Sequence, residues 1–151
     1  MYFVDRELME KRVSFLENEC DFLHTINSFT ENKLVERAVE RSIHTIIEAI
    51  LDIGNAMIDG FIMRDPGSYE DIIDIMLDER VITKDMELPL KTIIGLRKNV
   101  VNDYWNVDIE AIEHVVLTSL ASGKQFATSV RTYLENELGP VTAFTPLEIK
   151  E

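Results

Sequence analysis

The chemically richest stretch of this chain is residues 95–108, which hold an arginine, several amides and carboxylates, a tyrosine and the only tryptophan. The guanidinium of Arg97 is always charged and presents a fork of donors, which suits the holding of a phosphate group. The amide of Asn102 can hydrogen-bond a phosphate or a base, but it has no proton that titrates near neutrality. A core helix with a solvated polar face would have a similar composition. The segment is therefore either a phosphate-contacting site or a structural helix.

Apolar residues at helical spacing, including Leu96 and Val100, run through the same segment. We therefore predict one helix with an apolar side and a dense polar side. It should end close to Asp108, the expected cap of the next helix. Tyr104 follows Arg97 by seven residues, so their side chains would lie on nearly the same helix face.

A polar row on an earlier predicted helix is spaced by four residues and consists of His44, Glu48 and Asp52. This spacing keeps the three side chains on one face, and we expect Glu48 and Asp52 to be ionic partners of Arg97. His44 and Glu48 also have the separation of a metal-binding pair, but two ligands are too few for a zinc site. The alternative is a solvated or ion-paired helix face. We expect neither a metal nor another cofactor.

Composition excludes several classes of protein. Hydrophobic residues make up 46% of the 151 residues, which is a globular composition rather than a disordered one. No apolar run approaches the ~20 residues that span a bilayer, and the first residues lack the pattern of a signal peptide. The single cysteine excludes an intrachain disulfide and fits a reducing compartment. We therefore expect a cytoplasmic protein with no membrane contact.

The net charge of −13 bears on nucleic-acid binding. Non-specific affinity for nucleic acid comes from Lys and Arg side chains that neutralise phosphates, and this chain has 28 acidic residues against 15 basic ones. Any contact with RNA must therefore be confined to a local positive pocket or be made together with a partner.

Hydrophobic periodicity predicts an all-α protein, a five-helix up-and-down bundle without strands. The expected helices cover about residues 5–28, 32–63, 69–79, 89–106 and 108–138. The bundle would be one domain over residues 1–140, followed by a loosely ordered tail over residues 141–151.

Local signals set the expected helix boundaries. Residues 28–31 resemble a capping box that opens the second helix, and Ser68 resembles the N-cap of the third. Pro89 is tolerated only in a first helical turn, so the fourth helix should begin near it, with residues 84–88 as a separate turn. In the fifth helix, the small Gly123 would let another helix approach closely.

The second predicted helix carries apolar doublets that repeat about every four residues from Leu34 to Met57. Such a ridge is wider than a monomeric bundle of this size usually hides. We therefore expect a homodimer.

Residues 95–108 resemble the signature of the HepT-like branch of the HEPN superfamily (higher eukaryotes and prokaryotes nucleotide-binding domains). That signature is an arginine, a polar residue, a short spacer, a histidine, any residue and a tyrosine, followed by Val-Asp at the next helix. Arg97, Tyr104 and residues 107–108 match it, whereas Asn102 stands in the place of the histidine.

The resemblance extends over nearly the whole chain. Residues 37–62 resemble the long helix of the family, with Glu48 and Asp52 at its acidic positions. Residues 56–73, which include Arg-Asp-Pro-Gly-Ser-Tyr at residues 64–69, resemble the YutE-type bacterial members. The order of the predicted helices agrees with a HEPN-like bundle.

For active members, the resemblance implies metal-independent RNA cleavage, in which the histidine moves a proton and Arg97 holds the phosphate. Asn102 occupies the catalytic position but cannot move that proton, so we expect a ribonuclease that is weak or inactive. Lys98, Asn99 and Asp103 are expected to contact RNA or a nucleotide.

The resemblance also implies partners. Members of this branch are toxins of type VII toxin–antitoxin pairs, in which a minimal nucleotidyltransferase is the antitoxin. The cognate transferase can adenylylate the signature tyrosine, and Tyr104 keeps that place here. The alternative is that Tyr104 is a half-buried aromatic that anchors the helix end beside Trp105. Signature helices that meet across a two-fold axis agree with the homodimer.

Three functions remain open from the sequence. The first is an endoribonuclease toxin. The second is a non-catalytic HEPN homodimer that binds a minimal nucleotidyltransferase or a nucleotide, and the third is a helical scaffold without a nucleotide role. Asn102 argues against the first, whereas the intact Arg97 and Tyr104 argue against the third.

Overall fold

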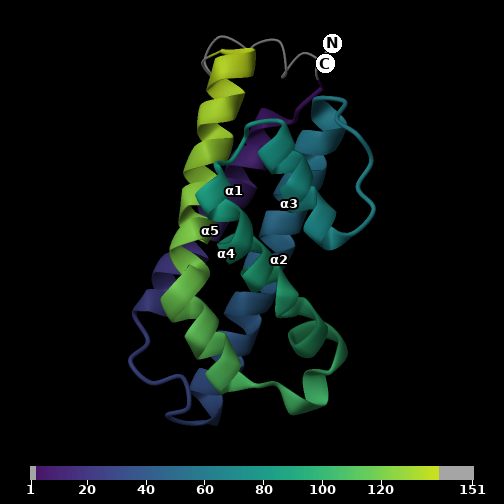
Figure 1. Ribbon diagram of the computed structural model, residues 1–151. Helices are drawn as coiled ribbons and strands as arrows, with labels where there is room; N and C mark the ends of the chain where they lie inside the picture. Colours follow the sequence, from purple (N-terminus) through teal and green to yellow (C-terminus); the bar gives the residue numbers. More distant parts are fainter. Residues whose placement is uncertain (1–2, 140–151) are drawn as a thin grey trace.

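The computed structural model describes residues 3–139. This part of the chain contains five α-helices and no strand (Figure 1). The helices are α1 (Arg6–His24), α2 (Lys33–Gly60), α3 (Tyr69–Asp78), α4 (Lys84–Gly95) and α5 (Ile109–Leu138). α1 packs against both α2 and α5, and α4 packs against α3 and α5. The predicted all-α bundle is confirmed.

Side-chain caps set where four of these helices begin. Asp5, Ser68 and Asp108 each accept a hydrogen bond from the backbone N–H three residues further on, at 3.0, 3.1 and 3.0 Å. Asn32 caps α2 in the same way at 2.9 Å. The predicted capping box at residues 28–31 is therefore wrong, because these residues belong to the turn before the cap.

Pro89 does not open α4. The helix already begins at Lys84, so Pro89 lies in its second turn and the predicted boundary is wrong. A proline there cannot donate a hydrogen bond to the carbonyl of Asp85, four residues back. Asp85 is exposed in the first turn of the helix, where water can satisfy that carbonyl.

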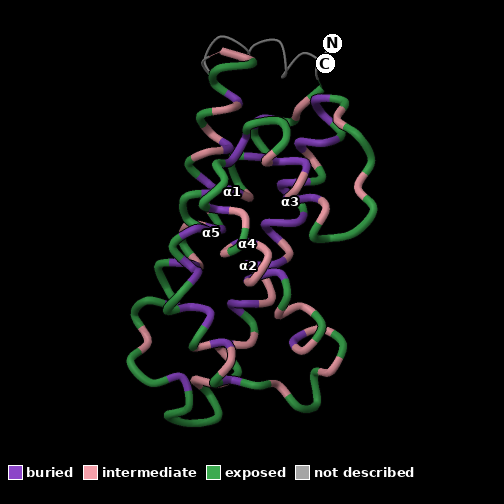
Figure 2. Tube along the Cα trace, viewed as in Figure 1, coloured by how far each residue is buried: buried purple, intermediate pink, exposed green. Residues whose placement is uncertain are grey.

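The apolar doublets of α2 are covered by other helices of the same chain. Ile43, Ile46, Ile50 and Ile53 have no exposed surface, and Figure 2 shows buried stretches along the middle of α2. Leu34, at the start of the ridge, remains 83% exposed. The argument that this ridge needs a second copy of the chain is therefore wrong, and the homodimer stays a prediction without that support.

α1 buries one of its two apolar rows. Met9, Leu16 and Leu23 belong to the core. The neighbouring row, spaced by seven residues, stays partly exposed: Leu8 at 41%, Phe15 at 42% and Phe22 at 40%. On the buried side, Cys20 Sγ lies 3.4 Å from the position that a Cβ at Gly123 would take. The close approach predicted at Gly123 therefore joins α5 to α1.

No helix within residues 3–139 combines the length and the apolar character needed to cross a bilayer. The predicted tail over residues 141–151 and the domain end at residue 140 lie outside the described residues. Both stay predictions.

Candidate functional site

Two irregular turns replace the helix that was predicted after α4. α4 ends at Gly95, and the chain then makes a π-helical turn, η1 (Lys98–Asn102), and a 3-10 turn, η2 (Tyr104–Asn106). The prediction of one continuous helix up to Asp108 is therefore wrong. Asp108 does cap α5, as expected, because its carboxylate accepts a hydrogen bond from the N–H of Ala111.

The π-turn changes where the side chains after it point. The N–H of Asp103 donates to the carbonyl of Lys98 at 3.0 Å, across five residues instead of the four of an α-helix. Asp103 then leaves the helical conformation, with φ −96° and ψ 43°. The prediction that Tyr104 shares a helix face with Arg97 is therefore wrong. Single π-turns of this kind are frequent at functional sites.

Arg97 is held from two other helices. Its Nε donates to Oε1 of Glu48 on α2 at 2.9 Å, and its guanidinium carbon lies 4.6 Å from the ring centroid of Tyr69 at the start of α3. The Arg97 side chain is 24% exposed. Its two terminal nitrogens donate no hydrogen bond to any residue between 3 and 139. The guanidinium is therefore fixed in place by Glu48 and Tyr69, while its two terminal nitrogens form no hydrogen bond with the described residues and can donate to a phosphate.

An ion pair positions the first turn of α3, where Tyr69 lies. Both terminal nitrogens of Arg64 donate to the carboxylate of Asp71, at 2.7 and 2.8 Å, and the N–H of Gly67 donates to it at 2.9 Å. The hydrogen bonds from Arg64, and then that from Gly67, lower the pKa of Asp71 to about 2. The loop between α2 and α3 is thereby tied to the turn that carries Tyr69.

Asn99 braces the loop that follows η1. Its Nδ2 donates to the carbonyl of Asn106 at 2.9 Å, and its Oδ1 accepts from the N–H of Asp108 at 2.8 Å. Both ends of this amide are engaged inside the protein, a structural role that sequence reasoning missed. Contact between Asn99 and RNA stays a prediction.

The remaining signature residues are more accessible. Lys98 and Asn102 are exposed, and Asp103 is half-buried. Tyr104 and Trp105 are 69% and 76% exposed, and their rings meet edge to face with centroids 5.7 Å apart. The alternative in which Tyr104 is a half-buried anchor is therefore wrong.

The predicted partnership with Arg97 holds for Glu48 but not for Asp52. The Oε1 atom of Glu48 accepts from Arg97, and Nε2 of His44 lies 4.0 Å from the same oxygen. Asp52 is exposed one turn further along α2, and no ion pair of the described residues joins it to Arg97. Only one of the two predicted carboxylates therefore holds the arginine.

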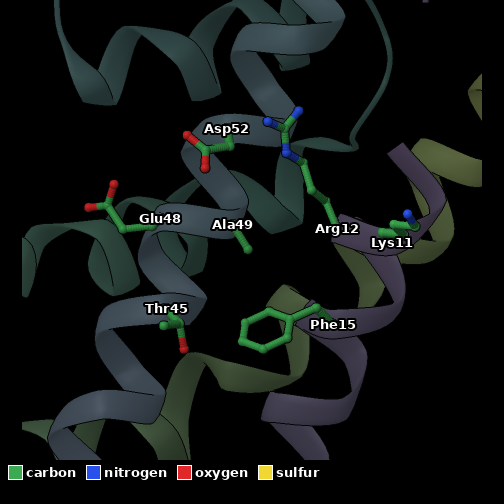
Figure 3. A pocket seen from close by; sticks show the side chains of 7 residues that line it. All are labelled: Lys11, Arg12, Phe15, Thr45, Glu48, Ala49 and Asp52. Atoms are coloured by element: carbon green, nitrogen blue, oxygen red, sulfur yellow. The ribbon is translucent and has the colours of Figure 1, made fainter. Parts of the chain in front are cut away.

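Asp52 instead lines a groove between α1 and α2 with a volume of about 280 Å³ (Figure 3). The lining residues are Lys11, Arg12 and Phe15 from α1, and Thr45, Glu48, Ala49 and Asp52 from α2. Because Glu48 belongs to both features, the groove borders the Arg97 site. Spacing along one helix could not reveal it, since its two walls come from helices far apart in the sequence.

The potential metal ligands and the single cysteine do not form a reactive site in the described residues. Over residues 3–139, no group of three or more His, Cys, Asp or Glu side chains is arranged to hold a metal ion. Cys20 is buried, and burial raises the pKa of its thiol to about 12. Since the thiolate is the reactive form, Cys20 is a core residue rather than a nucleophile.

Comparison with known proteins identifies the family. The sequence model of the family described as ribonuclease HepT-like matches residues 10–130. The chain belongs to this family. YutE of Bacillus subtilis (strain 168) is 43% identical over 144 residues, which are 95% of this chain and 99% of YutE. Its solved structure, that of a cytosolic protein of unknown function, has a TM-score of 0.90 and covers 95% of this chain and 100% of that one.

Two proteins of Shewanella oneidensis are more distant relatives. The mRNA nuclease HepT (strain MR-1) is 25% identical over 105 residues, which are 70% of this chain and 79% of that protein. A tri-AMPylated HEPN toxin, solved in complex with MNT antitoxin, is 20% identical, with a TM-score of 0.73, and covers 86% of this chain and 99% of that one. At this identity, the second similarity shows the fold alone.

This HepT-like chain brings together only part of the site predicted from its sequence. Arg97 and Glu48 meet, and Lys98 and Asn102 lie on the turn directly after Arg97. Sequence reasoning missed the ring of Tyr69, which contacts Arg97. Its only signal was a place at the end of the Arg-Asp-Pro-Gly-Ser-Tyr stretch.

Proposed function

We propose that this chain is the toxin component of a HepT-like toxin–antitoxin pair, that it binds RNA through Arg97, and that Asn102 weakens its cleavage activity. Membership of the HepT-like family and the fold shared with a HEPN toxin support the toxin role. RNA binding is proposed mainly from the guanidinium of Arg97. Its Nε donates to Glu48, while its two terminal nitrogens are available to a phosphate.

Asn102 leaves the expected chemistry incomplete. In metal-independent RNA cleavage, the 2′-oxygen loses its proton and attacks the adjacent phosphorus, and the 5′-oxygen of the next nucleotide leaves and gains a proton. Arg97 would hold the phosphate and the charge that develops on it. Asn102 can hydrogen-bond a phosphate oxygen but cannot take or give the proton. Loss of general acid–base catalysis costs ~100- to 10,000-fold in rate, so cleavage should be slow.

An imidazole on α2 lies close to this arginine. His44 and Arg97 both approach Oε1 of Glu48, at 4.0 and 2.9 Å. Imidazole suits proton transfer near neutrality. Any residual cleavage should therefore depend on His44.

Binding of a short single-stranded RNA to the purified chain tests the proposal. Arg97→Ala should lower the affinity about 10-fold or more in fluorescence anisotropy, because it removes a charge-assisted contact to phosphate. Arg80→Ala is the control, since Arg80 is exposed beside the C-terminal part of α5. Equal affinities of the wild type and Arg97→Ala would refute RNA binding at this site.

The exposed aromatic pair favours a second function, a non-catalytic homodimer that docks a minimal nucleotidyltransferase. Tyr104 and Trp105 are both more than two-thirds exposed, and these residue types dominate protein interfaces. The HEPN toxin with the shared fold was solved AMPylated and bound to an MNT antitoxin. We propose Tyr104 as the AMP acceptor of this chain. An AMP group there would add negative charge to this exposed aromatic pair.

Intact-mass spectrometry after co-expression with a minimal nucleotidyltransferase tests this second function. The wild type and Tyr69→Phe should gain the mass of AMP, whereas Tyr104→Phe should not. A gain that persists in Tyr104→Phe would assign the acceptor to another residue. Light scattering should give the mass of a dimer, and a monomer at micromolar concentration would contradict the homodimer.

A further inference from the structure

The groove between α1 and α2 is lined by an arginine, Arg12, that forms no ion pair with any residue between 3 and 139. Arg12, Arg97 and Arg131 are the half-buried arginines of residues 3–139. Arg97 and Arg131 both pair with glutamates, but no carboxylate of the described chain lies within 4.0 Å of Arg12. The buried Arg6 and the exposed Arg41, Arg80 and Lys98 also have no such carboxylate, so Arg12 differs in this respect only from the other two half-buried arginines of residues 3–139. Its position suits an anion that comes from outside the chain.

An aromatic ring faces the same groove. Phe15 is 42% exposed, and Figure 3 shows its ring directed from α1 towards Thr45 and Ala49 on α2. The Arg12 side chain extends along the same wall to the level of Asp52 (Figure 3). A base can stack on such a ring while its phosphate pairs with the arginine.

We propose that this groove binds one nucleotide of single-stranded RNA, adjacent to the phosphate at Arg97. Phe15 stacks on the base, Arg12 pairs with the phosphate, and Asp52 accepts a hydrogen bond from an exocyclic amino group of the base. The inference rests on the proposed RNA binding and adds a subsite to it. The volume of about 280 Å³ lies near the lower end of small-molecule sites, about 300 Å³. It suits a single nucleotide.

The acidic residues of the groove shape its specificity. Glu48 already accepts from Arg97, which offsets its charge at the end nearest to that site. Asp52 is exposed and can accept from cytosine, as carboxylates do in base recognition. Uracil has no exocyclic amino group, so the subsite should prefer cytosine to uracil.

Fluorescence anisotropy of labelled oligocytidine and oligouridine, each about eight nucleotides long, tests the subsite at roughly 50 mM salt. Phe15→Ala should weaken binding of oligocytidine about 5- to 150-fold, the cost of losing one base–aromatic stack. Phe22→Ala is the matched control, because Phe22 lies on the same row of α1, is 40% exposed and does not line the groove. Phe15→Leu, which keeps an apolar side chain but no ring, should weaken binding as Phe15→Ala does.

Two further variants test the polar contacts. Arg12→Gln should reduce the slope of log affinity against log salt by about 0.7, the loss of one phosphate contact on a single strand. Arg80→Gln removes the same charge elsewhere and should leave the slope unchanged. Asp52→Ala should abolish the preference for oligocytidine.

The outcomes separate this subsite from the proposed function. If Arg97→Ala weakens binding while Phe15→Ala and Phe15→Leu behave like Phe22→Ala, RNA binding stands and the subsite is refuted. If the wild type binds neither oligonucleotide, both proposals fail. If Phe15→Leu dissociates a dimer in light scattering and leaves RNA affinity unchanged, the groove belongs to a second copy of the chain and the subsite is likewise refuted.

Discussion

Arg97 and Arg131 are both half-buried and both pair with glutamates, but their surroundings differ. All three nitrogens of the Arg131 guanidinium donate, at 3.0 and 2.6 Å to Glu10, 2.7 Å to Glu17 and 3.2 Å to Ser14. Arg131 thereby ties α5 to α1. Arg97 uses only its Nε within the described chain. A saturated guanidinium braces two helices, whereas an unsaturated one in a fixed position is available to a ligand.

The largest expected effect concerns the general acid–base that is missing beside Arg97. Asn102→His should raise RNA cleavage ~100- to 10,000-fold by restoring a general acid–base. Adding Arg97→Ala to that variant should remove the gain, whereas adding Arg131→Gln should keep it. Gel assays of a labelled RNA measure the rates. A wild type that already cleaves as fast as Asn102→His would show that the histidine position is dispensable.

The next effect tests whether an imidazole on α2 serves the same arginine. His44→Gln should lower any residual cleavage by the wild type ~100-fold. In the Asn102→His background, the same substitution should have little effect, because the introduced imidazole can move the proton instead. A residual rate unchanged in His44→Gln would exclude proton transfer by this residue.

Substitution of Arg131, which ties α5 to α1, should lower the stability of the fold and leave RNA binding unchanged. Arg131→Ala should lower the free energy of unfolding by about 1–2 kcal/mol, since it removes the hydrogen bonds that Arg131 donates to Glu10 and Glu17. Its affinity for RNA should stay that of the wild type. Arg97→Ala should show the opposite pattern, with a small stability change and a large loss of binding. Urea denaturation and anisotropy on the same preparations measure both, and parallel losses in the two variants would contradict the distinction.

The smallest effect concerns the ion pair that positions Tyr69. The pKa of Asp71 is about 2, below its ordinary 3.8, so the folded state binds its proton less readily than the unfolded state. The pair therefore stabilises the fold above about pH 4, and that contribution disappears as the pH falls towards about 2. At neutral pH, Asp71→Asn should lower Tm by at most about 4 °C, since the pair is exposed. The difference from the wild type should vanish near pH 2, and a constant difference down to that pH would contradict the assignment.

The sequence by itself determined that the chain is all-α and where four of its five helices begin, but not the bounds of α4. Ser68 and Asp108 act within one turn of the chain, so their roles follow from neighbouring residues alone. The boundaries at residues 28–31 and at Pro89 were wrong for a related reason. Each is a local preference that a neighbouring cap or a longer helix overrode.

Only the tertiary structure decided which apolar rows are covered and which arginines are saturated. The ridge of α2 and the row of α1 that contains Phe15 both repeat at helical spacing. The ridge is buried under α1, α3 and α5, whereas the row that contains Phe15 stays partly exposed. Periodicity describes one helix at a time, whereas burial depends on neighbours from distant parts of the chain. For the same reason, the partners of Arg97 come from α2 and α3. No spacing within residues 95–108 could show that its terminal nitrogens would donate to none of the residues 3–139.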